Sequence, residues 1–188
     1  NINFFHSYEC CARQYWRSRP LCRHETTIVL IGFGNYGSSI LERAILTNII
    51  STDQHVAYHI FGDAGVFGAV HYRLGEFFSL NRESESGDSL IFHEETWAEN
   101  PSVLQQADRI IICEDDEQEG WSIFWTLNKY YRIPGRIDLR SSRKAPGVSY
   151  FGANEDIYTS QQIIRTGLNQ AAIMINELFR RSVTYPTL

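Results

Sequence analysis

Three glycines with a fixed spacing, Gly32, Gly34 and Gly37, form the stretch of this sequence best suited to chemistry. They follow a short apolar run, Ile28 to Ile31, and precede an amphipathic segment at 38–50. A strand, a glycine turn and a helix in this order are typical of sites that bind the diphosphate of a dinucleotide. Gly32 permits the tight turn, Gly34 lets a phosphate approach the backbone, and Gly37 lets the helix lie close to the sheet. The alternative is a tight turn that binds no ligand.

The start of the predicted helix would supply the phosphate-binding groups, because its first backbone N–H groups have no partner within the helix. The candidate residues are therefore the whole turn: Gly32, Phe33, Gly34, Asn35, Tyr36 and Gly37.

Acidic residues follow the later apolar runs. Asp63 comes after the run 56–61 and lies 26 residues beyond Gly37. An acid at about 20 residues from the glycines accepts a hydrogen bond from a ribose 2′-OH, which favours NAD over NADP. The alternative for Asp63 is an ordinary turn residue. Glu94 follows the run 89–92, and the pair Glu114 and Asp115 follows the run 109–113.

The composition excludes several classes of protein. The chain has 188 residues, of which 43% are hydrophobic and 21% charged, which indicates a globular rather than a disordered protein. The net charge of −5 without a basic stripe argues against nucleic acid as a partner. No apolar run reaches the roughly 18 residues of a membrane-spanning helix. The spacing of Cys10, Cys11, Cys22 and Cys113 favours reduced thiols and a cytoplasmic location. Because the chain begins at Asn1, we expect it to be a piece of a longer protein.

Short apolar runs alternate with helical segments along the rest of the chain, and this alternation predicts an α/β fold. We expect a Rossmann-like, doubly wound, mostly parallel sheet of six strands in the order 3-2-1-4-5-6. Its ligand crevice would lie at the carboxyl ends of the first and fourth strands. The six predicted strands are 28–31, 56–61, 89–92, 109–113, 136–139 and 148–151.

The two ends of the chain differ from this repeating pattern. Residues 1–25 are rich in aromatic residues and arginine, with a predicted helix from Ser7 to Ser18. We expect this N-terminal segment to cover the sheet, although it could instead be a linker from a preceding domain. The remainder, 26–188, is expected to be the nucleotide-binding domain. Its last part begins with a capping-box pattern at Thr159 and carries an apolar stripe that would pack on the sheet or form a dimer contact: Leu168, Ala171, Ile175, Leu178 and Phe179.

The sequence contains the segments VLIGFGNYGSS, RIIICEDDE and IDLRSS, and a predicted strand that ends at Asp63. Together these features resemble the TrkA-N or RCK domains that regulate potassium channels and transporters. The tail FGANEDIYTSQQIIRTGLNQAAIMINELF is similar to the end of a subgroup whose TrkA-N domain precedes a ryanodine-receptor-type (RyR) module. The resemblance covers about residues 26–180.

The resemblance implies a role for each candidate residue. It makes Gly32 to Gly37 the phosphate turn and Asp63 the ribose acceptor, and it places Glu94 near the adenine. Glu114 and Asp115 would lie near the other half of the cofactor. The implied ligand is NAD(H), with ADP, AMP or ADP-ribose as alternatives. The sequence departs from the family in its Gly62-Asp63 pair, in its long loop at 64–88, and in Glu114, which stands where a small polar residue is common and could crowd a phosphate or ribose.

These features predict a non-enzymatic regulatory domain that senses a nucleotide. We expect it to act as a homodimer or fused to a membrane or RyR-type domain, in potassium transport. One alternative is an NAD-dependent oxidoreductase, whose proton donor or nucleophile would have to be His59, His71, His93 or Cys113. Another is a degenerate Rossmann scaffold used for assembly. The acidic run Glu114 to Glu119 does not match a metal-binding loop, so no metal is predicted.

Overall fold

A seven-stranded parallel sheet forms the centre of the protein. The computed structural model describes residues 6–48, 53–84 and 87–159. The strand order is β3-β4-β2-β1-β5-β6-β7, and all paired neighbours run parallel. The strands are β1 (Thr27–Ile31), β2 (Ala57–Phe61), β3 (Ser79–Leu80), β4 (Ser89–His93), β5 (Arg109–Ile112), β6 (Arg136–Arg140) and β7 (Tyr150–Phe151).

The sheet confirms the predicted α/β, Rossmann-like fold and adds one strand. Without β3, the order is β4-β2-β1-β5-β6-β7, which is the predicted 3-2-1-4-5-6. The extra strand lies at the edge, where the Ser79 N–H donates to the Asp88 carbonyl at 3.1 Å and the Asn81 N–H to the Leu90 carbonyl at 2.8 Å. β3 lies within the segment 64–88, which the sequence predicts to be a long loop rather than a strand.

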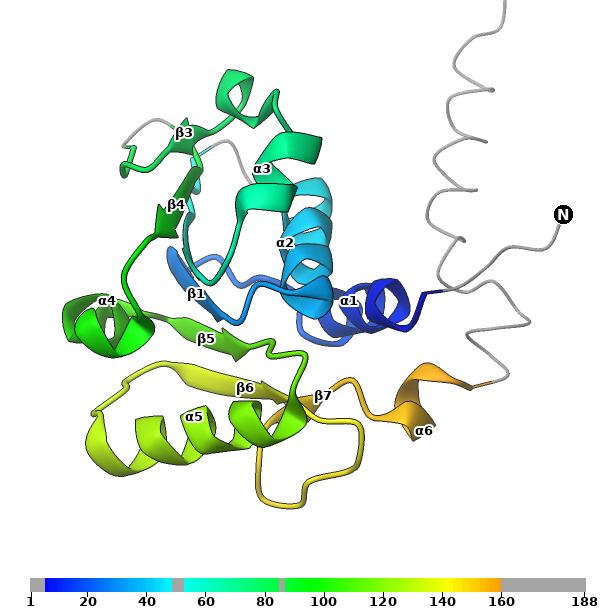
Figure 1. The fold of residues 1–188 in the computed structure, drawn as a ribbon. Coiled ribbons are helices and arrows are strands. Elements are labelled where there is room, and N and C mark those ends of the chain that lie inside the picture. The colour runs from blue at the N-terminus through cyan, green and yellow to red at the C-terminus, as the bar shows by residue number, and fades with distance from the viewer. Residues whose placement is uncertain (1–5, 49–52, 85–86, 160–188) are drawn as a thin grey trace, which may run out of the picture.

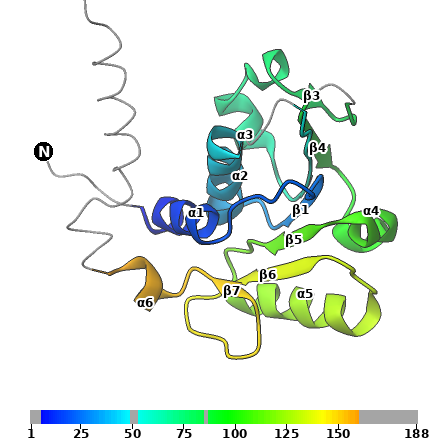
Figure 2. The same cartoon turned by 180° about the vertical axis from the view of Figure 1, so that it is seen from behind.

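Helices cover both faces of the sheet. In Figures 1 and 2, α1, α2 and α3 lie on one side, and α4 and α5 lie on the other. Two short 3-10 helices and a last helical turn complete the described part of the chain. The elements are α1 (Ser7–Ser18), α2 (Asn35–Thr47), α3 (Gly65–Val70), η1 (Leu74–Glu76), η2 (Trp97–Glu99), α4 (Pro101–Gln106), α5 (Glu117–Tyr130) and α6 (Asn154–Ile157).

The central strands are apolar on both faces, as a parallel sheet between two helical layers requires. Ile28 and Leu30 of β1 pack toward α1 and α2, whereas Val29 and Ile31 pack toward α4 and α5. All four side chains are at most 1% exposed. The sheet is therefore closely packed on both faces where the first strand enters the glycine turn.

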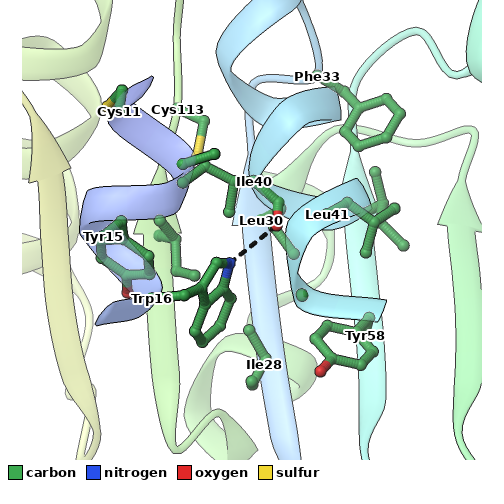
Figure 3. Close-up of a cluster of buried hydrophobic side chains, with 14 of the residues drawn as sticks. Cys11, Tyr15, Trp16, Ile28, Leu30, Phe33, Ile40, Leu41, Tyr58 and Cys113 are labelled. Atoms are coloured by element: carbon green, nitrogen blue, oxygen red, sulfur yellow. Dashed lines mark hydrogen bonds between the residues drawn. The ribbon is translucent and has the colours of Figure 1, made fainter. Parts of the chain in front are cut away.

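The N-terminal helix α1 has the predicted bounds and packs against the sheet next to α2. Tyr15 and Trp16 are only 1% and 4% exposed. Figure 3 shows Trp16 pointing toward α2, where its indole N–H donates to the Ile40 carbonyl at 2.9 Å. The same cluster contains Ile28 and Leu30 of β1, so α1 shares one hydrophobic core with the sheet.

A buried polar network also joins the N-terminal segment to the sheet. The Arg109 guanidinium at the start of β5 donates to both carboxylate oxygens of Glu25, each at 2.7 Å. It also donates to the Arg19 carbonyl at 2.9 Å. The Tyr15 hydroxyl donates to Asp138 of β6 at 2.8 Å. The buried charges of Arg109, Glu25 and Asp138 therefore all have hydrogen-bond partners. An unpaired charge in the interior would be strongly destabilising.

The predicted capping box and apolar stripe of the C-terminal segment lie outside the described residues, apart from Thr159. Within the part of the chain that is described, no helix is both long and apolar enough to cross a membrane.

Candidate functional site

A cleft of about 680 Å³ opens at the carboxyl ends of the strands. It lies beyond the last residues of β1, β2 and β4, where ligands bind in folds of this type. Three of the predicted acids, Asp63, Glu94 and Glu114, line it together. Parallel strands bring their carboxyl ends to one edge of the sheet, which explains why acids separated in the sequence meet here.

The glycine turn next to the cleft has the predicted backbone geometry. Gly32 adopts a φ of 87°, a conformation that disfavours any residue with a side chain. A Cβ atom on Gly37 would lie 2.1 Å from the Gly32 carbonyl oxygen, so only glycine lets α2 begin this close to the turn. The structural roles predicted for these two glycines therefore agree with the structure, whereas their role in binding a ligand remains a prediction.

The carboxylate of Asp115 occupies the space in front of Gly34. A Cβ atom on Gly34 would lie 2.6 Å from Asp115 Oδ2. Oδ2 accepts hydrogen bonds from the Asn35 backbone and side-chain nitrogens, each at 3.0 Å, and Oδ1 accepts one from the Tyr36 backbone N–H at 3.2 Å. The two N–H groups that the sequence predicts to be free for a phosphate are thus bonded to an anion of the chain itself.

Arg140, at the end of β6, holds the backbone that carries Asp115. Its Nε donates to the Glu114 carbonyl at 2.8 Å and its Nη2 to the Asp115 carbonyl at 3.1 Å. The same guanidinium lies 4.4 Å from the centre of the Tyr36 ring, within the range of a cation–π contact. The side chain of Tyr36 thus contacts the arginine that positions Asp115.

Glu114 closes the space on the other side of the turn. Its carboxyl carbon would lie 2.6 Å from a Cβ atom on Gly32, and its side chain also lines the cleft. Burial raises the pKa of Glu114, and the negative charges of Glu119, Asp115 and Asp116 raise it further. The Glu114 carboxyl is thus surrounded by other negatively charged side chains.

Three other residues predicted to bind the cofactor take no part in the hydrogen bonds between Asp115 and the glycine turn. Asp63 Oδ1 accepts a hydrogen bond from the Gly65 N–H at 2.9 Å, which is the behaviour of a turn residue at the start of α3. Its side chain also faces the cleft. Phe33 is 7% exposed and packs edge-on against Phe67, with ring centres 5.2 Å apart, so it belongs to the core. Glu94 lines the cleft.

The cleft does not fit a diphosphate in this arrangement. Of the described residues that line it, none is lysine or arginine, and five are acidic: Asp63, Glu94, Glu95, Glu114 and Glu119. The hydrogen-bond donors at the glycine turn serve Asp115. A dinucleotide would therefore meet negative charge without a compensating cation, at a turn whose donors are in use.

Two histidines on neighbouring strands form a pair that the sequence does not predict. Nδ1 of His59 and Nε2 of His93 are 3.0 Å apart, and His93 stacks on the Phe61 ring at a centroid distance of 4.2 Å. From the sequence, each histidine is a separate candidate proton donor. They meet because β2 pairs with β4 in a register that sets His59 next to Ile91 and Phe61 next to His93. The sequence does not specify this register. Burial lowers the pKa of both histidines.

This pair predicts that acid destabilises the protein. Burial, and then the neighbouring His93, lower the pKa of His59 from 6.5 to about 4. The folded state then binds fewer protons than the unfolded state between these values, so stability is full above pH 6.5 and is lost as the pH falls toward 4. At about 1.4 kcal/mol per pKa unit, we expect a loss of roughly 2 to 3 kcal/mol through His59. Urea unfolding at a series of pH values measures this loss.

The control for this experiment is His59→Gln, which cannot take up a proton in this range. Its unfolding free energy should fall less steeply with decreasing pH than that of the native chain. Parallel slopes for the two proteins would show that His59 does not cause the acid sensitivity.

The remaining candidate nucleophile is Cys113, which directly follows β5. Cys113 is fully buried, and burial raises the pKa of its thiol well above the usual value, so it is not activated as a nucleophile. Across residues 6–48, 53–84 and 87–159, no group of three or more His, Cys, Asp or Glu side chains is placed to hold a metal ion.

A scan against models of protein families gave no match for this chain, and neither did a search of curated proteins.

Proposed function

We propose that this chain is a regulatory domain that binds the nucleoside part of an adenine nucleotide in the cleft. The observation that carries the proposal is the placement of a glycine turn, with its positive-φ Gly32 and closely packed Gly37, directly beside a cleft of about 680 Å³. In doubly wound sheets this is the position at which nucleotides bind. A cleft of this size lies within the range of small-molecule sites.

The cleft offers acceptors and aromatic surface suited to a nucleoside. The carboxylates of Asp63 and Glu94 can accept hydrogen bonds from ribose hydroxyls and from the amino group of adenine. Phe92 and Trp97 also line the cleft and supply apolar surface. A nucleoside is uncharged, so it does not suffer the repulsion that the acidic lining imposes on a phosphate.

The resemblance to TrkA-N and RCK domains supports a regulatory role. We also propose that the protein regulated in this way takes part in potassium transport. In such a domain, the ligand changes the balance between two arrangements of the larger protein, to the extent that it binds one arrangement more tightly. An oxidoreductase would need a proton donor beside the substrate. His93 lines the cleft, and turnover of NAD(H) with a panel of substrates would favour that alternative.

Calorimetric titration of the full chain tests the proposal. The ligands are adenosine, AMP, ADP, ADP-ribose, NAD and NADH. We expect at least adenosine to bind, and Asp63→Asn to weaken that binding by about tenfold, because one charged hydrogen bond is lost. Asparagine keeps an oxygen that can accept from the Gly65 N–H, so the turn at the start of α3 is preserved.

Glu83→Gln provides the matched control, since it removes one negative charge from an exposed residue that does not line the cleft. Its affinity for adenosine should equal that of the native chain. The proposal fails if none of the six ligands produces heat, or if Asp63→Asn and Glu83→Gln bind equally well.

A degenerate fold used only for assembly is the second candidate, and one observation favours it. The chain's own Asp115 satisfies the donors of the glycine turn, so the fold is complete without a ligand there. This candidate predicts no heat from any of the six ligands, which separates it from the first.

A further inference from the structure

The carboxylate of Asp115 stands where the phosphate of a bound nucleotide would have to stand. It accepts from the backbone N–H groups of Asn35 and Tyr36, the first two residues of α2. A phosphate at this turn would need the same donors. Two anions cannot share them, because each N–H offers one proton and like charges a few ångströms apart repel strongly where water is partly excluded.

The neighbouring residues fix the position of Asp115 from both directions. Arg140 donates to the carbonyls of residues 114 and 115, as described above. On the other side, Asp116 caps α5, because its Oδ1 accepts from the Gln118 N–H at 2.8 Å and the Glu119 N–H at 3.4 Å. The backbone of Asp115 is thus tied to the end of β6 and to the start of a helix of 14 residues.

Glu114 adds a second barrier to an anion. Its side chain lies against Gly32 and also lines the cleft, so it lies between Gly32 and the cleft. An anionic group that reached Gly32 from the cleft would lie against this carboxylate. The two acids therefore act on the same part of the ligand.

From this geometry, and resting on the proposed function, we propose that Asp115 determines the ligand class of the cleft. It acts as a built-in anion that excludes a phosphate or diphosphate from the glycine turn. The native chain accordingly binds an uncharged nucleoside in preference to ADP, ADP-ribose or NAD. Removal of this one carboxylate frees the backbone N–H groups of Asn35 and Tyr36 to bind a phosphate.

Two variants and two kinds of ligand test this inference. In Asp115→Ala the donors at Asn35 and Tyr36 become free, so we expect affinity for ADP and ADP-ribose to rise at least about tenfold, while affinity for adenosine changes less than about twofold. Asp115→Asn keeps the size of the side chain but removes its charge, and we expect an intermediate gain. Circular dichroism spectra are the check that both variants are folded.

Glu119→Gln is the control for a general effect of charge. It removes one negative charge from the lining of the same cleft but leaves Asp115 at the turn. We expect it to improve ADP binding by less than about threefold. An equal gain in Glu119→Gln and Asp115→Ala would overturn the inference, because local occupation of the turn would then be irrelevant.

Inorganic pyrophosphate separates this inference from the proposed function. It should raise the melting temperature of Asp115→Ala but not that of the native chain, whether or not any nucleoside binds. If adenosine fails to bind and pyrophosphate still stabilises the variant, the proposed function is wrong and the role of Asp115 stands. If the native chain binds ADP-ribose more tightly than adenosine, or if pyrophosphate stabilises neither protein, the inference is wrong.

Discussion

Replacement of Arg109 by methionine is expected to destabilise the protein by about 3 to 5 kcal/mol, because it leaves a buried carboxylate without its partner. Arg109 is 2% exposed and Glu25 is 5% exposed. The substitution removes both hydrogen bonds to Glu25 and the bond to the Arg19 carbonyl. Urea unfolding followed by circular dichroism measures the loss as a lower transition midpoint.

A double variant tests the reason for this loss. Arg109→Met combined with Glu25→Gln removes the unpaired charge as well, and glutamine keeps an oxygen for the Cys22 N–H, which donates to Glu25 Oε2 at 2.7 Å in the native chain. We expect the double variant to be more stable than Arg109→Met by at least about 1 kcal/mol. Equal stability would mean that packing of the long arginine side chain, rather than the buried charge, is what matters.

Arg73→Met serves as the control with matched hydrogen bonding. Arg73 also donates to both oxygens of a carboxylate, from Nε at 3.0 Å and from Nη2 at 2.7 Å, to Glu76. Both of these side chains are more than half exposed, at 62% and 54%. Because water already screens this pair, we expect its removal to leave the unfolding transition unchanged.

Trp16→Ala is expected to cost about 3 to 5 kcal/mol, the usual range when a large aromatic side chain is removed from a core. Trp16 is 4% exposed and packs with Ile28, Leu30 and Ile40, and its indole N–H bonds to the Ile40 carbonyl (Figure 3). The substitution would leave a cavity between α1 and α2 and would remove the indole hydrogen bond to the Ile40 carbonyl. The free energy of unfolding should be measured by circular dichroism, since the variant loses a fluorescent residue.

Trp125→Ala is the matched control, because Trp125 on α5 is 61% exposed. We expect its loss to change stability by no more than about 0.5 kcal/mol. A small effect of Trp16→Ala, comparable to that of Trp125→Ala, would contradict the view that α1 is part of the domain core. It would instead support the interpretation of residues 1–25 as a linker.

The strand order and the glycine turn could be predicted because they depend on local properties of the chain. Apolar runs such as 109–113 must be buried, and buried parallel strands connected by helices allow few arrangements. The φ of Gly32 and the close approach at Gly37 follow from the absence of a side chain, which the sequence states directly.

The pairings between distant residues could not be predicted in this way. Arg109 opens an apolar strand, and nothing near it in the sequence indicates that Glu25, 84 positions away, is its partner. His59 and His93 are joined only by the register of β2 and β4. In each case the partners are chosen by strand and helix placement, which depends on the whole chain.

The sequence by itself determined a Rossmann-like sheet with a glycine turn and acids at its carboxyl edge, since hydrophobic periodicity and glycine are local signals. Only the tertiary structure decided what these acids do. Asp115 lies 80 residues from Asn35 in the sequence, and yet its carboxylate takes the donors of the turn. The physical reason is that an acid placed by β5 and Arg140 at the start of α2 satisfies unpaired N–H groups as a phosphate would. Residue type alone does not distinguish these two uses of an acidic residue.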